Sequence, residues 1–232
     1  MTPVFVLIPL ALVAALAAGV IAASRRLGEP QAARRRAVFL TVAASAVWMG
    51  ATWWAAASGA LRQWNATPPP LVILVAAIVI LAGAIAFTGY GARLVRGLPL
   101  WTLVAVQAFR LPLELAMHVQ YERGIMPEQM SYSGRNFDIV TGATAIVVAW
   151  LAATGRAGRG LVAGWNVLGF ALLLNIVVVA ILSTPIFRYF GDDRLNVWVT
   201  DPPFVWLPAV MVLAALSGHL LIFRALWKRG HG

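Results

Sequence analysis

Four polar side chains lie inside one long apolar stretch, residues 101–122. Gln107, Arg110, Glu114 and His118 follow one another at spacings of three, four and four residues. On an α-helix these spacings place the side chains on one face. A guanidinium can bind an anionic group, whereas a carboxylate or an imidazole can hold or relay a proton. We therefore interpret this stripe as a candidate ligand-binding site.

A charged stripe is costly if the stretch that carries it crosses a membrane. On translocon scales each charged side chain costs roughly 2.5–3.5 kcal/mol at the middle of a membrane helix, so such residues need partners. The stripe could be a functional site, or it could be a structural network in which Arg110 and Glu114 neutralise each other. Glu114 and His118 also have a spacing that suits a metal ion, but a third ligand is not evident and we assign no metal site.

The depth of each side chain follows from its position along the helix. With Arg110 near the midplane, a rise of ~1.5 Å per residue puts Glu114 about 6 Å and His118 about 12 Å further outward. Pro112 lacks a backbone N–H and clashes with the carbonyl of residue 108, so it should interrupt this helix. A broken membrane helix beside charged groups is typical of a polar site.

Other predicted spans offer partners for the stripe. Asn175 is expected at the depth of the stripe's carboxylate, and His219 lies on the cytoplasmic half of the last span. Arg135 and Asp138 are expected at the outer face, at the level of His118, where the segment GRNFD would form the mouth of the site. We include Asn175, Arg135 and Asp138 among the candidate ligand-binding residues.

The composition is that of an integral membrane protein. Of 232 residues, 61% are hydrophobic and 11% are charged, with a mean hydropathy of +0.83. Soluble domains are roughly 45–50% apolar and about 25% charged. The chain has no cysteine, which excludes disulfides and thiolate metal centres. The net charge of +10 does not indicate a nucleic-acid partner, because the basic residues fall in short loops between apolar segments.

The apolar segments predict an all-α fold, a single seven-helix transmembrane domain over residues 1–232. Spans of about 20 residues match a hydrocarbon thickness of roughly 30 Å. The predicted spans are about 3–24, 37–58, 70–90, 100–121, 137–154, 161–183 and 204–226, and segments 25–36 and 91–99 are predicted to be loops. Gly160 and Gly164 have the spacing of small residues that favours close helix packing.

The distribution of basic residues predicts the orientation. Loops on one side and the C-terminal tail carry twelve of them, against five on the other side. The twelve are Arg25, Arg26, Arg34, Arg35, Arg36, Arg93, Arg96, Arg156, Arg159, Arg224, Lys228 and Arg229, and the five are Arg62, Arg123, Arg135, Arg188 and Arg194. Because positive residues stay in the cytoplasm, the N-terminus is predicted outside and the C-terminus inside.

Two known seven-helix chemistries do not fit the positions of the residues they need. A retinal pigment requires a lysine in mid-membrane, and the only lysine is Lys228 at the end of the last span. A haem held by two histidines requires both at one depth, whereas His118 and His219 are expected some 15 Å or more apart. The cofactor, if there is one, stays unknown.

Four segments carry a resemblance to a known group of proteins. FRLPLELAMH, MSYSGRNFDIVTG, GWNVLGFALLLNIV and PPFVWLPA are similar to segments of uncharacterised bacterial polytopic membrane proteins with no assigned function, over roughly residues 100–226. The resemblance implies a multi-pass protein of the bacterial plasma (inner) membrane. It implies no activity, substrate or cofactor.

Three functional hypotheses remain open from the sequence. The leading one is a membrane protein that binds or transports a small solute, ion or lipid headgroup, with Arg110 holding an anionic group and Glu114 and His118 tuning charge. The second is an intramembrane enzyme, with or without a metal ion, that uses Glu114 or His118. The third is a structural or assembly subunit. The lipid bilayer is the expected environment, and an oligomer is compatible with each hypothesis.

Overall fold

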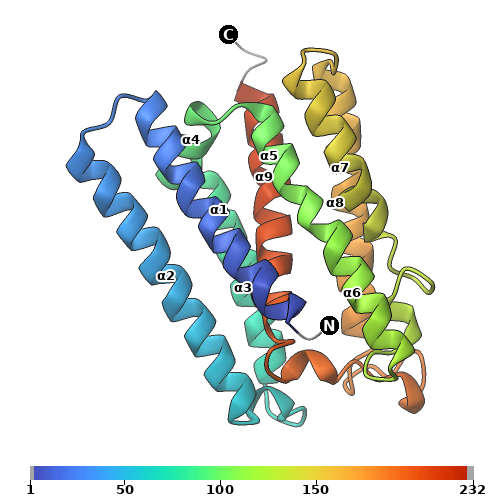
Figure 1. Ribbon diagram of the computed structural model, residues 1–232. Helices are drawn as coiled ribbons and strands as arrows, with labels where there is room; N and C mark the ends of the chain where they lie inside the picture. Colours follow the sequence, from blue (N-terminus) through green and yellow to red (C-terminus); the bar gives the residue numbers. More distant parts are fainter. Residues whose placement is uncertain (1–2, 229–232) are drawn as a thin grey trace.

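A computed structural model describes residues 3–228, and over this range the regular secondary structure is helical with no strand. Figure 1 shows the helices as one roughly parallel bundle. The helices are α1 (Val4–Arg26), α2 (Gln31–Ala57), α3 (Pro70–Phe87), α4 (Gly89–Gly97), α5 (Leu100–Val106), α6 (Arg110–Glu122), α7 (Asp138–Ala153), α8 (Arg159–Leu182) and α9 (Leu213–Lys228). A π-helical segment, Leu207–Val212, leads into α9, and short 3₁₀ turns cover Ala60–Arg62, Gln107–Phe109, Glu128–Met130, Asp192–Arg194 and Trp198–Thr200.

Six of the seven predicted spans are long and apolar enough to cross a membrane within the described residues, which indicates a multi-pass membrane protein. They are Val4–Arg26, Gln31–Ala57, Pro70–Phe87, Leu100–Glu122, Arg159–Leu182 and Leu207–Trp227. The predicted fifth span, 137–154, is the helix α7, which has only 16 residues and is shorter than the other six.

Two segments predicted as loops are largely helical. Arg25 and Arg26 belong to α1 and the arginines at 34–36 to α2, so only a short turn separates these helices. Segment 91–99 lies mostly in α4, whose Leu94 and Val95 are buried. The apolar face of α4 packs on α1 closely enough that a Cβ at Gly97 would lie 2.6 Å from the Cβ of Ala23. The arginines lower the local hydropathy as loop residues do, so the hydropathy pattern did not predict helix at these positions.

The helix break in the fourth span lies before Pro112 rather than at it. Pro112 is the third residue of α6, in the first turn, where a helix does not need its N–H. The break lies just before it, as the 3₁₀ turn Gln107–Phe109 that contains residue 108. The predicted interruption of this helix is therefore confirmed.

The segment between α6 and α7 folds back into the bundle. Its side chains Gln129, Met130, Ser131 and Asn136 are all at most 3% exposed. As a result α7 begins about half-way along the neighbouring α8 (Figure 1). The expectation that Asp138 lies at the outer face, level with His118, is therefore wrong. The sequence shows a polar segment there, but not that tertiary contacts bury it.

Glycines at 142, 169 and 218 allow helices to approach closely around the middle of the bundle. A Cβ at Gly142 of α7 would lie 2.3 Å from the backbone nitrogen of Leu111 in α6. A Cβ at Gly169 would lie 2.8 Å from the His219 ring. By contrast, Gly160 and Gly164 have open space around them, so the predicted close packing at this pair is wrong.

We expect Gly142→Ala to destabilise the protein by about 1–3 kcal/mol, because an added methyl group must push α7 away from the backbone of α6. The free energy of unfolding can be measured by titration with sodium dodecyl sulfate in mixed micelles. Gly164→Ala is the control and should raise this free energy by up to about 1 kcal/mol, because open space surrounds this position and alanine favours a helix. Equal effects of the two substitutions would contradict the packing described here.

Candidate functional site

A buried ion pair joins α6 to the start of α7. Nη2 of Arg110 lies 2.6 Å from Oδ2 of Asp138, and the two side chains are only 2% and 5% exposed. The Thr141 hydroxyl lies 3.5 Å from the other carboxylate oxygen. A charge buried in an apolar bundle requires a partner of opposite sign. The ion pair therefore fixes the position at which α7 begins.

The other terminal nitrogen of Arg110 contacts α9. Nη1 of Arg110 donates a hydrogen bond to Nε2 of His219 over 3.0 Å. Because arginine has only donors, Nε2 must accept, and the imidazole carries its proton on Nδ1. That nitrogen donates to Oδ1 of Asn166 (2.8 Å), whose amide group donates in turn to the backbone oxygen of His219 (3.2 Å). His219 is therefore neutral in this arrangement. Nη1 of Arg110 is hydrogen-bonded, whereas Nη2 has the ion-pair contact with Asp138 and no hydrogen-bond partner.

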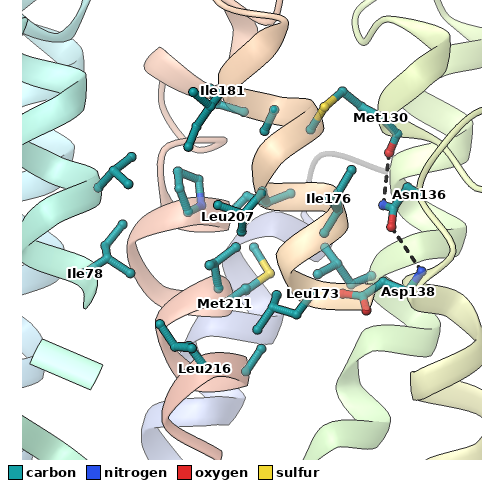
Figure 2. A pocket seen from close by; sticks show the side chains of 18 of the residues that line it. Ile78, Met130, Asn136, Asp138, Leu173, Ile176, Ile181, Leu207, Met211 and Leu216 are labelled. Atoms are coloured by element: carbon teal, nitrogen blue, oxygen red, sulfur yellow. Dashed lines mark hydrogen bonds between the residues drawn. The ribbon is translucent and has the colours of Figure 1, made fainter. Parts of the chain in front are cut away.

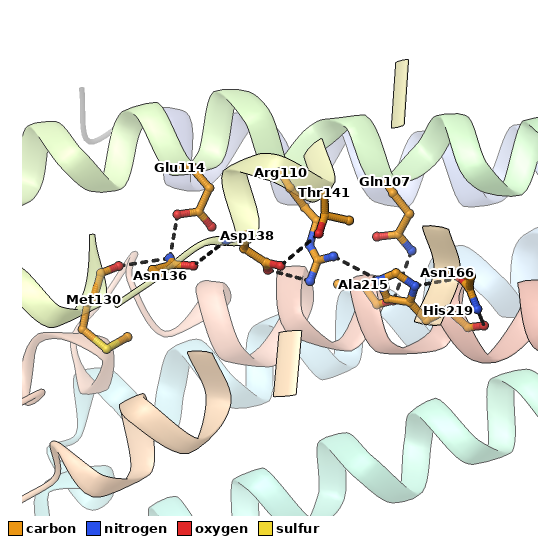
Figure 3. Close-up of polar contacts among 10 residues, drawn as sticks. All are labelled: Gln107, Arg110, Glu114, Met130, Asn136, Asp138, Thr141, Asn166, Ala215 and His219. Carbon is orange, nitrogen blue, oxygen red and sulfur yellow. Dashed lines mark hydrogen bonds and ion pairs between the residues drawn. The ribbon is translucent and has the colours of Figure 1, made fainter. Parts of the chain in front are cut away.

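Glu114 lies one helical turn beyond Arg110 and has a different partner. The amide nitrogen of Asn136 donates to Oε2 of Glu114 over 2.6 Å and to the backbone oxygen of Met130 over 3.0 Å. Figure 3 shows these residues, Arg110 and His219 as one continuous chain of contacts. The ion pairs among the described residues include none between Arg110 and Glu114, so the self-neutralising pair is not formed.

Gln107 supports the chain from one turn before Arg110. Its amide nitrogen donates to the backbone oxygen of Ala215 in α9 over 3.1 Å. A Cβ at Gly218 would lie 2.1 Å from the same nitrogen, so glycine is needed to admit the amide. Gln107 is thus a link between the fourth and last predicted spans.

A cavity of about 160 Å³ ends at this polar chain. Its walls come from α3, α6, α8 and the π segment with α9, and are apolar apart from a few groups (Figure 2). Arg110, Glu114, Asn136 and Asp138 form its polar end. A cavity of 150 Å³ in another protein holds benzene, so this one suits a small ligand or one end of a longer one.

The cavity reaches the outer surface of the bundle between α3 and α8. Val79 of α3 and Leu174 of α8 both line it, although they are 56% and 45% exposed. These two helices pack on α9 and its π segment, which form the floor between them. A molecule dissolved in the surrounding apolar phase could therefore enter sideways.

The polar end of the cavity holds two carboxyl groups and one cation. The carboxyl groups belong to Glu114 and Asp138 and the cation is Arg110, whereas the hydrogen bonds of His219 make it neutral. Because Arg110 is paired with Asp138, the Glu114 carboxylate lacks a cation of its own. The polar end of the cavity therefore favours a cation or a hydrogen-bond donor over an anion.

The structure places His118 apart from the Arg110–Asp138 pair, although His118 and Arg110 both lie on α6. Nδ1 of His118 lies 2.8 Å from the Ser131 hydroxyl and Nε2 lies 3.5 Å from the Glu122 carboxylate. Its ring stacks on Tyr132 at a centroid distance of 4.3 Å. These contacts hold the folded-in segment against the end of α6 rather than line the cavity.

Two further candidates also lie outside the cavity. The exposed amide of Asn175 donates to the backbone oxygen of Arg135 over 2.8 Å. The Arg135 guanidinium lies over the ring of Phe190, 5.3 Å from its centroid. These contacts hold segment 123–137 against α8 and the connection that follows it. The structure therefore brings together only Gln107, Arg110, Glu114 and Asp138 of the seven candidates.

Sequence reasoning did not select Asn136, Asn166 or His219 as site residues. Asn136 lies in a segment whose composition is that of a loop, and its burial depends on tertiary contacts. Asn166 and His219 do carry a signal, since both are polar residues inside apolar spans.

Comparisons with protein-family models, curated proteins and solved structures find no match to this chain. Within residues 3–228 no cluster of three or more potential metal ligands occurs.

We expect Asp138→Asn to destabilise the protein by about 3–5 kcal/mol, because it leaves the buried Arg110 charge without its partner. The double variant Arg110→Met/Asp138→Leu should lose less stability than the sum of the losses in the single variants Arg110→Met and Asp138→Leu, since no unpaired buried charge remains. Unfolding in mixed micelles measures these differences. Asp201→Asn is the control, because its ion pair with Arg62 is exposed and should contribute only about 0–1 kcal/mol. Strict additivity of the two buried changes would contradict this account.

Proposed function

We propose that the chain spans the membrane seven times, with the N-terminus outside and the C-terminus in the cytoplasm of a bacterial plasma (inner) membrane. In this topology α7 and the folded-in segment 123–137 together complete the fifth crossing. The basic turns between α1 and α2 and between α7 and α8 lie at the end of the bundle where α9 ends, which supports this orientation (Figure 1). Of the charges used to predict it, Arg229 and the side chain of Lys228 lie outside the described residues.

The absence of cysteine from the sequence allows a direct test of this topology. We expect a cysteine at Ser58, after α2, to react with a membrane-impermeant maleimide on intact spheroplasts. A cysteine at Thr154, after α7, should react only after lysis. The reverse pattern would invert the orientation, and reaction of both sites in intact spheroplasts would contradict seven crossings.

We propose that the protein binds a small amphiphile in the cavity, with an apolar part between α3 and α8 and a cationic or hydrogen-bond-donating group at Glu114. The observation that carries this proposal is that Glu114 lies at the inner end of an apolar cavity without a cation of its own. Arg110 is less suited to hold the ligand, because Asp138 and His219 already occupy its terminal nitrogens. Recognition is therefore assigned to the carboxylate rather than to the guanidinium.

The lateral opening supports a ligand that comes from the bilayer. Exposed residues of α3 and α8 line the entrance, so an alkyl chain can extend outward while the polar group stays inside. Burial of the apolar part would contribute roughly 25 cal/mol per Å² of apolar surface removed from water. A charge-assisted hydrogen bond to Glu114 would then set the orientation.

We expect hexylamine to bind the purified protein in nanodiscs and hexanoate not to bind, as measured by isothermal titration calorimetry against empty nanodiscs. Glu114→Gln should weaken hexylamine binding by at least ~10-fold, because it removes the charge but keeps the size and the acceptor for Asn136.

Glu122→Gln is the matched control, since this carboxylate lies on the same helix but is 61% exposed and does not line the cavity. It should leave hexylamine binding unchanged. Binding of hexanoate that Arg110→Met abolishes would contradict the proposal, because the guanidinium would then be the recognition group.

A further inference from the structure

The cavity has a second polar wall, formed by Asn196, whose buried acceptor lacks a donor. Asn196 lines the cavity and is only 2% exposed. Its amide nitrogen donates to the backbone oxygen of Ala180 over 3.3 Å, but its Oδ1 has no hydrogen-bond partner. An acceptor buried without a donor costs free energy, so this atom indicates a missing partner.

Gln129 repeats the same pattern beside Asn196. It is 3% exposed, and its amide nitrogen donates to the Ser183 hydroxyl over 3.0 Å and to the backbone oxygen of Arg194 over 2.7 Å. Its Oε1 has no partner. Both residues contact Ser183, because the backbone nitrogen of Asn196 donates to the backbone oxygen of Ser183 over 2.7 Å.

The hydrogen bonds establish which amide atoms are unpaired. A backbone oxygen can only accept, so the amide atoms that face Ala180 and Arg194 must be nitrogens. The unpaired atoms of Asn196 and Gln129 are therefore oxygens. Of the two residues, only Asn196 lines the cavity, so it alone offers an acceptor to a donor there.

The two polar walls are separated by a short distance along α8. Asn175 of α8 binds the backbone of Arg135, which places the adjacent Asn136 and its partner Glu114 near the level of Asn175. Asn196 binds the backbone of Ala180, five residues further along α8. At ~1.5 Å per residue the separation along the helix is about 8 Å. Leu173, Ile176 and Met211 line the cavity as apolar residues (Figure 2).

We propose that the ligand has a hydrogen-bond donor at each end of a short apolar linker, one end at Glu114 and the other at Asn196. This inference rests on the proposed binding function and narrows its ligand class. The Glu114 end takes an ammonium group, since it offers a carboxylate. The Asn196 end takes a hydroxyl group, because burying a second charge beside neutral amides is costly. A six-carbon amino alcohol carries these two groups at the ends of an apolar linker and serves as the probe.

The test compares hexylamine with aminohexanol in nanodiscs by isothermal titration calorimetry. In the wild-type protein aminohexanol should bind about threefold to tenfold more tightly, because its hydroxyl satisfies the free oxygen of Asn196. The added hydroxyl lowers hydrophobicity, so burial alone predicts the opposite order.

Asn196→Leu should reverse the order, so that hexylamine binds more tightly, and retained hexylamine binding shows that the variant is folded. Gln120→Leu is the matched control: both amide atoms of Gln120 are buried without partners, but it does not line the cavity. It should leave the wild-type order unchanged. If hexylamine binds but aminohexanol does not bind more tightly, this inference is overturned and the proposed function stands. If hexylamine itself does not bind, the proposed function fails.

Discussion

The ion pair between Arg110 and Asp138 is the constraint on which the rest of this bundle depends. Two charges buried to 2% and 5% exposure stabilise the fold only when they meet, and they meet only if α7 begins at the depth of Arg110. The preceding segment must then fold into the bundle, which explains why Gln129, Ser131 and Asn136 are buried although they lie between two helices. Gly142 permits the required close approach of α7 to α6.

The same ion pair determines which group is available to a ligand. Arg110 forms an ion pair with Asp138 through Nη2 and donates through Nη1 to neutral His219, so its charge is neutralised within the protein. Glu114 remains as the second carboxylate, held by an uncharged amide and facing an apolar cavity. A structural network and a binding site are therefore not alternatives here. The network leaves one carboxylate without a cation, and that carboxylate defines the site.

Part of the fold and site follows from the sequence. Apolar length and the positions of charges identify six of the spans, and helical periodicity places Gln107, Arg110 and Glu114 on the face that meets α9 and α7. Pro112 correctly predicts a helix break. The partner of Arg110 could not be predicted, because it depends on how far segment 123–137 enters the bundle. His118 shares the helix face but lies two turns from Arg110, where it meets Ser131 and Tyr132 instead. Nothing in the sequence marks Asn196 as a site residue, since its burial depends on the path of the long connection between α8 and the π segment.

The most direct measurement is an experimental structure of the protein with bromohexylamine, in which anomalous scattering locates the bromine. The account predicts one bromine peak in the cavity lined by Ile78, Ile176 and Met211, with the ammonium group within hydrogen-bond distance of Glu114. It also predicts that the Arg110–Asp138 contact persists in the complex. A bromine peak outside the cavity, or an ammonium group that displaces Arg110 from Asp138 and leaves Glu114 untouched, would contradict it.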